Sequence, residues 1–323
     1  MTAPVTIEIW RGPAVESRHA VHAVLMDGAG KIKQVYGDAN RPTFPRSALK
    51  PLQAIALVET GASAAHNLSN AELALACASH SGEQSHVLTV SGWLTRLGLD
   101  ENALECGAHS PYASTCSPAT ILSNNCSGKH TGMLTLCRHM QVPHQGYIDV
   151  NHPAQHKILQ TVAEICGVAV TPATCGVDGC SAPNPVMPLS ALAAGFAKFM
   201  NPRSLSIQRG TACRHLYQAM VEHPELVGGT KRMDTILMQA ARRKIMCKVG
   251  GEGVYGVVVP EKDTVIALKA EDGNIRAVEA ALYAVLERHD LADSATLDAA
   301  RPHALNVLKN WNGREVGQIR IGK

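Results

Sequence analysis

The sequence predicts an α/β fold with one sheet that mixes N- and C-terminal strands, beside a mostly helical lobe. Short apolar runs separated by turn residues are typical of strands, and they occur before residue 45 and again after residue 244. Ala-rich segments with helix caps fill the middle of the chain. Strands at both ends with helices between them indicate a sheet lobe of residues 1–45 plus 244–323 and a helical lobe of residues 46–243.

The individual elements follow from the same signals. We expect N-terminal strands at residues 6–10, 20–26 and 32–36, and late strands at residues 246–249, 254–259 and 264–268. We expect helices at residues 49–59, 84–97, 129–139, 189–199, 214–222, 234–241 and 276–288, and one that starts at Ser69 or Asn70. The cleft between the two lobes is then the expected place for a binding site.

Length and composition limit the class of protein. A chain of 323 residues corresponds to about two domains or lobes and can bury a large core. The composition, 46% hydrophobic and 18% charged, is typical of a compact soluble enzyme. The formal charge of +3 is too small for a nucleic-acid-binding surface. We see no membrane-spanning run and no signal-peptide pattern, so we expect a cytoplasmic protein without nucleic-acid or membrane partners.

The chain contains ten cysteines, which a cytoplasmic location would keep reduced. Cys77 and Cys137 lie in apolar helical segments, where a cysteine usually acts as a small buried hydrophobic residue. Cys126 and Cys180 differ because polar and charged residues surround them in sequence. Clustered cysteines of this kind more often serve metal binding or catalysis.

Ser47 and Lys50 form a Ser-x-x-Lys pair, which places both side chains on one face of a helix. A serine becomes a good nucleophile when a base accepts its proton, and a lysine can do so when its pKa is lowered. A helix start with a solvated lysine has the same spacing. Pro51 fits the first turn of a helix, where backbone N–H groups favour negative charge. Arg46 is a candidate to hold a substrate carboxylate.

A second serine, Ser79, follows an apolar helix, although a capped helix end would explain this segment as well. Serine enzymes that recognise penicillin use Ser-x-x-Lys, Ser-x-Asn and Lys-Thr-Gly motifs in that order. Here Ser123-Asn124-Asn125 and Lys248-Val249-Gly250 follow Ser47 in the same order, with valine in place of threonine. The order of these segments favours an acyl-transfer cleft.

Cys126, Lys129 and Cys180 suggest a metal site, since thiolates are good zinc ligands. A lysine ligand would have to be neutral, and a bound metal lowers its pKa in that direction. Two reduced cysteines in glycine-rich turns are the alternative. Asp178 is either an acceptor for an ammonium group or a turn residue.

Several motifs, in the same order along nearly the whole chain, resemble those of the rhizobial-type, class 3 L-asparaginases of the asparaginase II family. The motifs occupy residues 15–19, 46–53, 79–83, 106–111, 124–130, 175–180, 228–235 and 251–254. The resemblance implies a fold similar to serine β-lactamases and glutaminases, a homodimer, and hydrolysis of L-asparagine to L-aspartate and ammonia.

The resemblance also implies roles for individual residues. Ser47 pairs with Lys50, and Ser79 is the second active-site serine, with Lys248 as its partner. The implied zinc ligands are Cys126, Lys129 and Cys180, with the substrate-binding residues Arg46, Asp178 and His130 nearby. Zinc would aid substrate binding without being strictly required. A related serine amidase or glutaminase remains an alternative, as does a non-catalytic protein that zinc stabilises.

Overall fold

One antiparallel sheet combines strands from both ends of the chain in the computed structural model, which describes residues 2–113 and 118–322. Its strands are β1 (Val5–Arg11), β2 (Ala14–Met26), β3 (Ile32–Tyr36), β8 (Met246–Gly250), β9 (Val254–Val259), β10 (Thr264–Ala270), β11 (Val307–Lys309) and β12 (Glu315–Ile321). The order across the sheet is β11-β12-β1-β2-β10-β9-β8, and β3 also pairs with β2. The predicted α/β class, with a sheet drawn from both termini, is confirmed.

Strand β2 joins the two ends of the chain. Its first half pairs with β1, and its second half pairs with β3 on one edge and with β10 on the other. Met26 at its end lies opposite Val265 of β10. Residues 21–26 are buried without alternation, which requires cover on both faces of the sheet.

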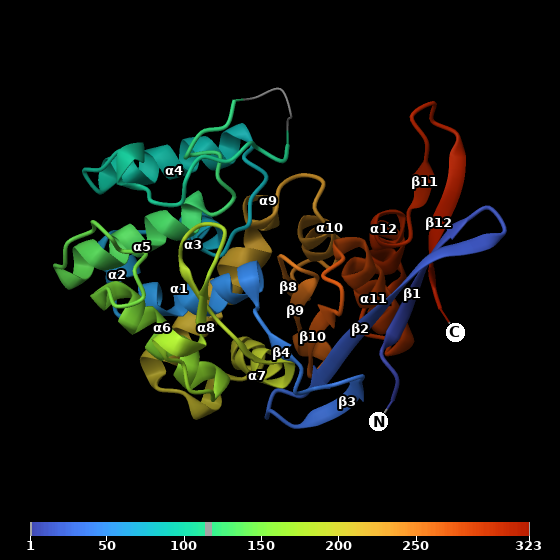
Figure 1. Cartoon of the computed structure of the whole chain (residues 1–323). Helices are drawn as coiled ribbons and strands as arrows, with labels where there is room; N and C mark the ends of the chain where they lie inside the picture. The colour runs from blue at the N-terminus through green and yellow to red at the C-terminus, as the bar shows by residue number, and fades with distance from the viewer. Residues whose placement is uncertain (1, 114–117, 323) are drawn as a thin grey trace.

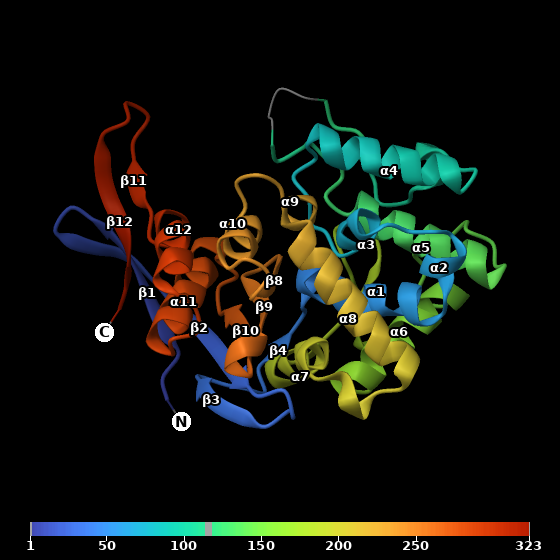
Figure 2. The same ribbon diagram turned by 180° about the vertical axis from the view of Figure 1, so that it is seen from behind.

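Most of the helices form a second lobe beside the sheet (Figures 1 and 2). The helices are α1 (Lys50–Glu59), α2 (Ala62–Ala65), α3 (Asn70–Ala76), α4 (Gln84–Arg96), α5 (Ser127–Met140), α6 (Pro153–Cys166), α7 (Leu189–Met200), α8 (Ile207–Glu222), α9 (Pro224–Val227), α10 (Met233–Ala240), α11 (Ile275–Arg288) and α12 (Ser294–Ala304). Helices α1 to α6 and α8 lie together, whereas α11 and α12 lie with the sheet (Figure 1). Helices α7 and α11 both pack against β2, β9 and β10 and so cover the sheet. No helix of the described ranges is long and apolar enough to cross a membrane.

Two short sheets lie outside the main one. Strand β4 (Pro42–Thr43) pairs with β7 (Met187–Pro188), and β5 (Cys175–Val177) pairs with β6 (Pro183–Pro185). The β5–β6 hairpin carries the turn of residues 178–182, so it presents Asp178 and Cys180 beside the lobe boundary.

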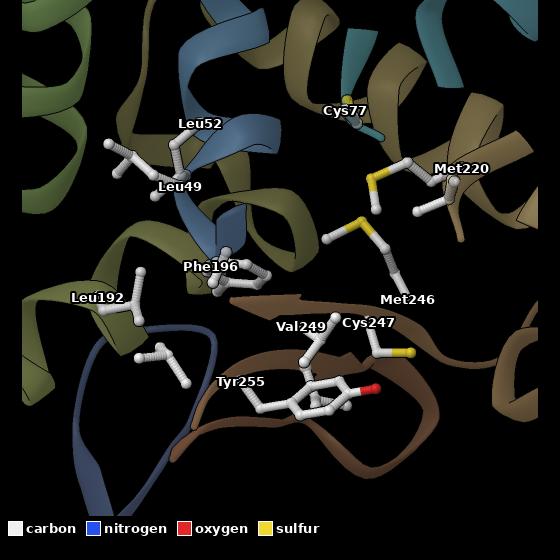
Figure 3. Close-up of a cluster of buried hydrophobic side chains, with 14 of the residues drawn as sticks. Leu49, Leu52, Cys77, Leu192, Phe196, Met220, Met246, Cys247, Val249 and Tyr255 are labelled. Atoms are coloured by element: carbon white, nitrogen blue, oxygen red, sulfur yellow. The ribbon is translucent and has the colours of Figure 1, made fainter. Parts of the chain in front are cut away.

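An apolar cluster fixes the helical lobe against the sheet (Figure 3). Leu49 comes from the turn before α1, Leu52 comes from α1, Phe196 comes from α7, and Val249 comes from β8. A Cβ atom at Gly256 of β9 would lie 2.3 Å from Cζ of Phe196, so this ring needs a glycine beneath it. Its members Leu49, Cys77 and Val249 lie within two residues of Ser47, Ser79 and Lys248 in sequence.

The segment that carries Ser47 is a 3-10 turn, η1 (Arg46–Leu49), which continues into α1 with Pro51 in the first helical turn. Arg46 has a φ of +52°, a left-handed conformation that is uncommon for a residue other than glycine. Strand β8 approaches η1 closely, because a Cβ atom at Gly250 would lie only 2.2 Å from the carbonyl oxygen of Pro45. The glycine of the Lys-x-Gly segment therefore permits contact between the late sheet and the Ser47 turn.

Several elements extend beyond the sequence-based expectations. Helices α6 and α12 and the β11–β12 hairpin had no predicted counterpart, and α8 begins at Ile207, earlier than the expected residue 214. Strand β12 pairs with β1, so the sheet is wider than the six predicted strands would make it. Pro302 lies inside α12 and breaks the usual helix pattern.

Candidate active site

A cavity of about 550 Å³ opens between the two lobes. Its lining residues are Arg46, Ser47, Ser79, His109, Tyr112, Asn124, Asn125, Cys126, Asp178, Gly179, Cys180, Arg232, Val249, Gly250, Gly251, Ile275 and Glu279. Six of the ten predicted site residues belong to this lining, and the other four, Lys50, Lys129, His130 and Lys248, are buried around it.

The two predicted serines meet in the cavity. Ser79 Oγ donates a hydrogen bond to Ser47 Oγ over 3.2 Å, and Asn125 Nδ2 donates to Ser79 Oγ over 3.2 Å. The backbone N–H of Ser79 donates to the carbonyl of Val227, which fixes the segment after α3. The three polar groups form a connected chain, so each hydroxyl has a defined orientation.

Lys50 is buried behind the serines. Its Nζ donates to the carbonyl oxygens of Ala78, over 2.6 Å, and of Asn125, over 3.3 Å. These carbonyls belong to the residue before Ser79 and to the residue that binds Ser79. The lysine is thus adjacent to the serine pair, and the described residues contain no hydrogen bond from its ammonium to Ser47 Oγ.

Lys248 is completely buried on β8, and its contacts differ from the Ser79 pairing that the resemblance implies. Its Nζ lies 3.3 Å from Asp234 Oδ2 and donates to the carbonyl of Val249 over 2.8 Å. Asp234 also accepts from Tyr255 Oη and from the backbone N–H of Val249. Burial lowers the pKa of Lys248 to about 8, although the charge of Asp234 opposes that change. In the described ranges, no hydrogen bond joins Lys248 to Ser79.

Cys126, Lys129 and Cys180 converge on one wall of the cavity. Lys129 Nζ donates to Cys180 Sγ over 2.9 Å. A hydrogen bond from Cys126, together with the charge of Lys129, lowers the pKa of the Cys180 thiol, and the same hydrogen bond and burial raise the pKa of Cys126. Burial would lower the pKa of Lys129, but the neighbouring thiolates outweigh it and raise that pKa. These shifts favour a thiolate at Cys180 beside the ammonium group of Lys129.

His130 stands behind this pair on α5. Its Nδ1 lies 2.7 Å from Tyr147 Oη, and burial lowers its pKa to about 4. Its Nε2 is buried beside Cys180 without a hydrogen-bond partner among the described residues. The imidazole is therefore neutral and has a lone pair or a proton available on the side of the thiolate.

The residues around Cys180 fit a zinc ion in donor type. They supply two sulfur atoms, one amine and a neighbouring imidazole nitrogen without a partner, and zinc favours nitrogen and sulfur ligands. Within residues 2–113 and 118–322, no three His, Cys, Asp or Glu side chains are grouped so as to hold a metal ion. A zinc site here consequently depends on Lys129 as the third ligand.

Arg46 and Asp178 bind each other across the mouth of the cavity. Both Nε and Nη2 of Arg46 lie 2.9 Å from Asp178 Oδ1. Asp178 also accepts from Gly179 N and from Asn184 Nδ2. Burial and the Cys180 charge would raise the pKa of Asp178, but Lys129 and Arg46 outweigh them and hold it below its usual value. Each of these two predicted substrate-binding residues is already paired.

Several lining residues were not predicted from the sequence. Asn125 binds Ser79, and Arg232 and Glu279 add charge to the cavity lining. Asn125 and Arg232 lie inside two motifs of the family resemblance, residues 124–130 and 228–235, which implied no role for either residue. Glu279 is one of several charged residues on the predicted helix 276–288, and no local pattern distinguishes it.

The fold and the cavity together define an α/β protein with two serine hydroxyls and buried lysines between a sheet and a helical lobe. The chain belongs to the L-asparaginase II family, whose family model matches residues 7–321. Family membership makes the protein an enzyme of the amidohydrolase type.

Two further comparisons complete the picture. A crystal structure of a β-lactamase from Mycobacterium bovis is similar, with 14% sequence identity and a TM-score of 0.45, over 88% of this chain and 92% of that chain. The comparison with curated proteins gives no significant match.

Proposed function

We propose that the protein hydrolyses L-asparagine to L-aspartate and ammonia through an acyl-enzyme on an active-site serine. The observation that carries the proposal is the hydrogen-bonded pair of Ser47 and Ser79 in the cavity of an L-asparaginase II family member. A hydroxyl pair beside buried lysines supplies both a nucleophile and a route for its proton.

The reaction has two halves. The attacking serine Oγ, of Ser47 or Ser79, forms a bond to the side-chain amide carbon and transfers its proton to a neighbouring lysine in its neutral form. The tetrahedral intermediate then breaks its C–N bond, and the nitrogen takes the proton and leaves as ammonia. Water attacks the resulting ester, its proton passes along the same route, and L-aspartate is released with the serine restored.

The developing oxyanion requires hydrogen-bond donors. Ser47 lies in the first turn of η1, where its backbone N–H has no partner within the helix. A donor aimed at the developing charge stabilises the transition state more than the substrate. This arrangement favours Ser47 as the serine whose acyl group lies nearest to a backbone donor.

Zinc, bound by Cys126, Lys129 and Cys180, would supply a positive charge on the cavity wall that aids substrate binding. Its binding would require Lys129 to lose the proton that now pairs with Cys180, so affinity for zinc should increase with pH. The hydroxyl chemistry described above does not depend on it.

The test is ammonia release from L-asparagine and L-glutamine, measured side by side with and without added zinc. Fast release from L-asparagine and slow release from L-glutamine would support the proposal. The serine double variant S47A/S79A is the control for contaminating activity. Release that is faster from L-glutamine would make the protein a glutaminase, and a folded protein without release from either amide would refute the proposal.

A further inference from the structure

The motif of residues 228–235 contributes Arg232 to the cavity lining, and Ser81 and Glu83 hold the first residues of this motif in place. Ser81 Oγ donates to the carbonyl of Gly228 over 2.8 Å, and the Glu83 carboxylate accepts from both N and Oγ1 of Thr230. Gly229 has a φ of +111°, and a Cβ atom there would lie 2.4 Å from Ser81 Oγ. These contacts fix the backbone conformation of residues 228–230.

Arg232 of this motif lines the cavity. Its guanidinium carbon lies 5.6 Å from the ring centre of Tyr112, which borders the same cavity. In the described part of the chain, Arg232 makes no ion pair, whereas two nitrogen atoms of Arg46 already bind Asp178. A carboxylate that enters the cavity therefore meets one cation that is already paired and another, Arg232, that is not.

Glu279 complements Arg232 from the first turns of α11. Glu279 and Asp178 supply the carboxylates that line the cavity, and the described residues give Glu279 no hydrogen bond. Burial raises the pKa of Glu279 to about 7, while the charge of Arg232 opposes this and that of Asp234 adds to it. In a buried carboxyl group with a raised pKa, a cation that binds with the ligand stabilises the ionised form.

We propose that Arg232 binds the α-carboxylate and Glu279 the α-ammonium group of the substrate. The proposal rests on the proposed function and assigns the specificity of the same site. It makes the cavity selective for amides of α-amino acids over amides that lack either charged group. Arg46 and Asp178 would then hold each other and the wall beside Cys180 rather than the substrate.

Two analogues of L-asparagine separate the roles. Succinamic acid lacks the α-ammonium group, and β-alaninamide lacks the α-carboxylate. Binding of all three ligands is measured by calorimetry in the S47A/S79A background, where no turnover is expected. R232Q should weaken the binding of L-asparagine and succinamic acid by about 10- to 100-fold and leave the binding of β-alaninamide nearly unchanged. E279Q should weaken the binding of L-asparagine and β-alaninamide and leave the binding of succinamic acid nearly unchanged.

The matched control is Lys231→Gln, which removes an equal charge from an exposed neighbour of Arg232 and should change no affinity. R232K keeps the charge and should retain part of the preference for a carboxylate, and it replaces R232Q if that variant does not fold. If R232Q weakens the binding of all three ligands equally, the proposal is overturned. It is also overturned if R46Q, and not R232Q, selectively weakens binding of the two ligands that carry the carboxylate.

Ammonia release by the unmutated protein separates the two proposals. Turnover of L-asparagine, combined with unchanged affinities in R232Q and E279Q, would overturn this assignment and leave the function intact. If those variants lose affinity selectively but the unmutated protein shows no turnover, the proposed function is overturned and the assignment of Arg232 and Glu279 remains intact. Absence of both binding and turnover would overturn the two together.

Discussion

The hydroxyl oxygen atoms of Ser79 and Ser47 lie 3.2 Å apart, with Ser79 as the donor. Asn125 occupies another position on Ser79 Oγ, so the proton of Ser79 points toward Ser47. Ser47 Oγ accepts this hydrogen bond and keeps its own proton available for transfer. This polarity would stabilise negative charge on Ser47 during attack.

We therefore expect S47A to reduce kcat more than S79A. Loss of a nucleophile should lower kcat by at least about 10³-fold, and loss of a hydroxyl that only assists should lower it by about 10²-fold. Steady-state ammonia release measures both, with circular dichroism to check that each variant is folded. The reverse order would identify Ser79 as the attacking group.

The pH dependence of the rate tests whether Lys248 takes part in the proton transfer, since no hydrogen bond joins this lysine to Ser79 in the described residues. Burial lowers the pKa of this lysine to about 8, so it loses its proton as the pH rises through that value. A lysine accepts a proton only in its neutral form, hence kcat/KM should increase as the pH rises from 7 to 9. In K248M this rising limb should disappear, together with most of the activity. A K248M profile that still rises through pH 8 would assign the limb to another group.

Gly250 should be intolerant of even a methyl group. In G250A the added carbon would meet the carbonyl oxygen of Pro45 at 2.2 Å, which would force η1 and Ser47 away from β8. We expect a loss of stability of about 1–3 kcal/mol, as for overpacked cores, and a lower kcat. Urea unfolding and ammonia release measure the two effects.

Gly92 provides the matched control for this substitution. It lies inside α4 with no atom within 4 Å of an added Cβ. G92A should stabilise the protein by about 0.5–1 kcal/mol, because alanine favours the helix, and should leave the activity unchanged. Equal effects of G250A and G92A would show that the approach of β8 to η1 is not a constraint.

Zinc binding should depend on the thiol pair. Added zinc should raise the Tm of the unmutated protein, since a ligand that binds only the folded state stabilises it. C126S and C180S should each lose this increase. C175S, a cysteine on β5 that lies outside the cavity lining, should keep it. An increase that persists in C126S and C180S would place the metal elsewhere.

Much of the fold was accessible from local sequence patterns. Alternating or continuous apolar runs predicted β1 to β3 and β8 to β10, and caps such as Ser69 predicted the helices between them. The β11–β12 hairpin was missed because β12 is only partly buried, so its pattern of apolar residues is weak. Its place in the sheet is set by pairing with β1, which is a long-range contact that no local window contains.

For the site, the sequence predicted the candidate residues but not the partners of their side chains. The motifs identified the serines, the lysines and the thiols, but spacing says nothing about partners on distant segments. Lys248 illustrates this, because its companion Asp234 lies on another element and was not considered. The implied homodimer, cytoplasmic location and zinc content stay predictions.

The pairing of Met26 with Val265 encloses most of the chain between two neighbouring strands. Contacts this distant in sequence form slowly, because the loop between them must close first. During synthesis, Ser47 and Ser79 would emerge early, while Val249 and Gly250, which complete the same cavity, would emerge near the end. A nascent chain that already carried both serines would therefore lack the part of the cavity wall that Val249 and Gly250 supply.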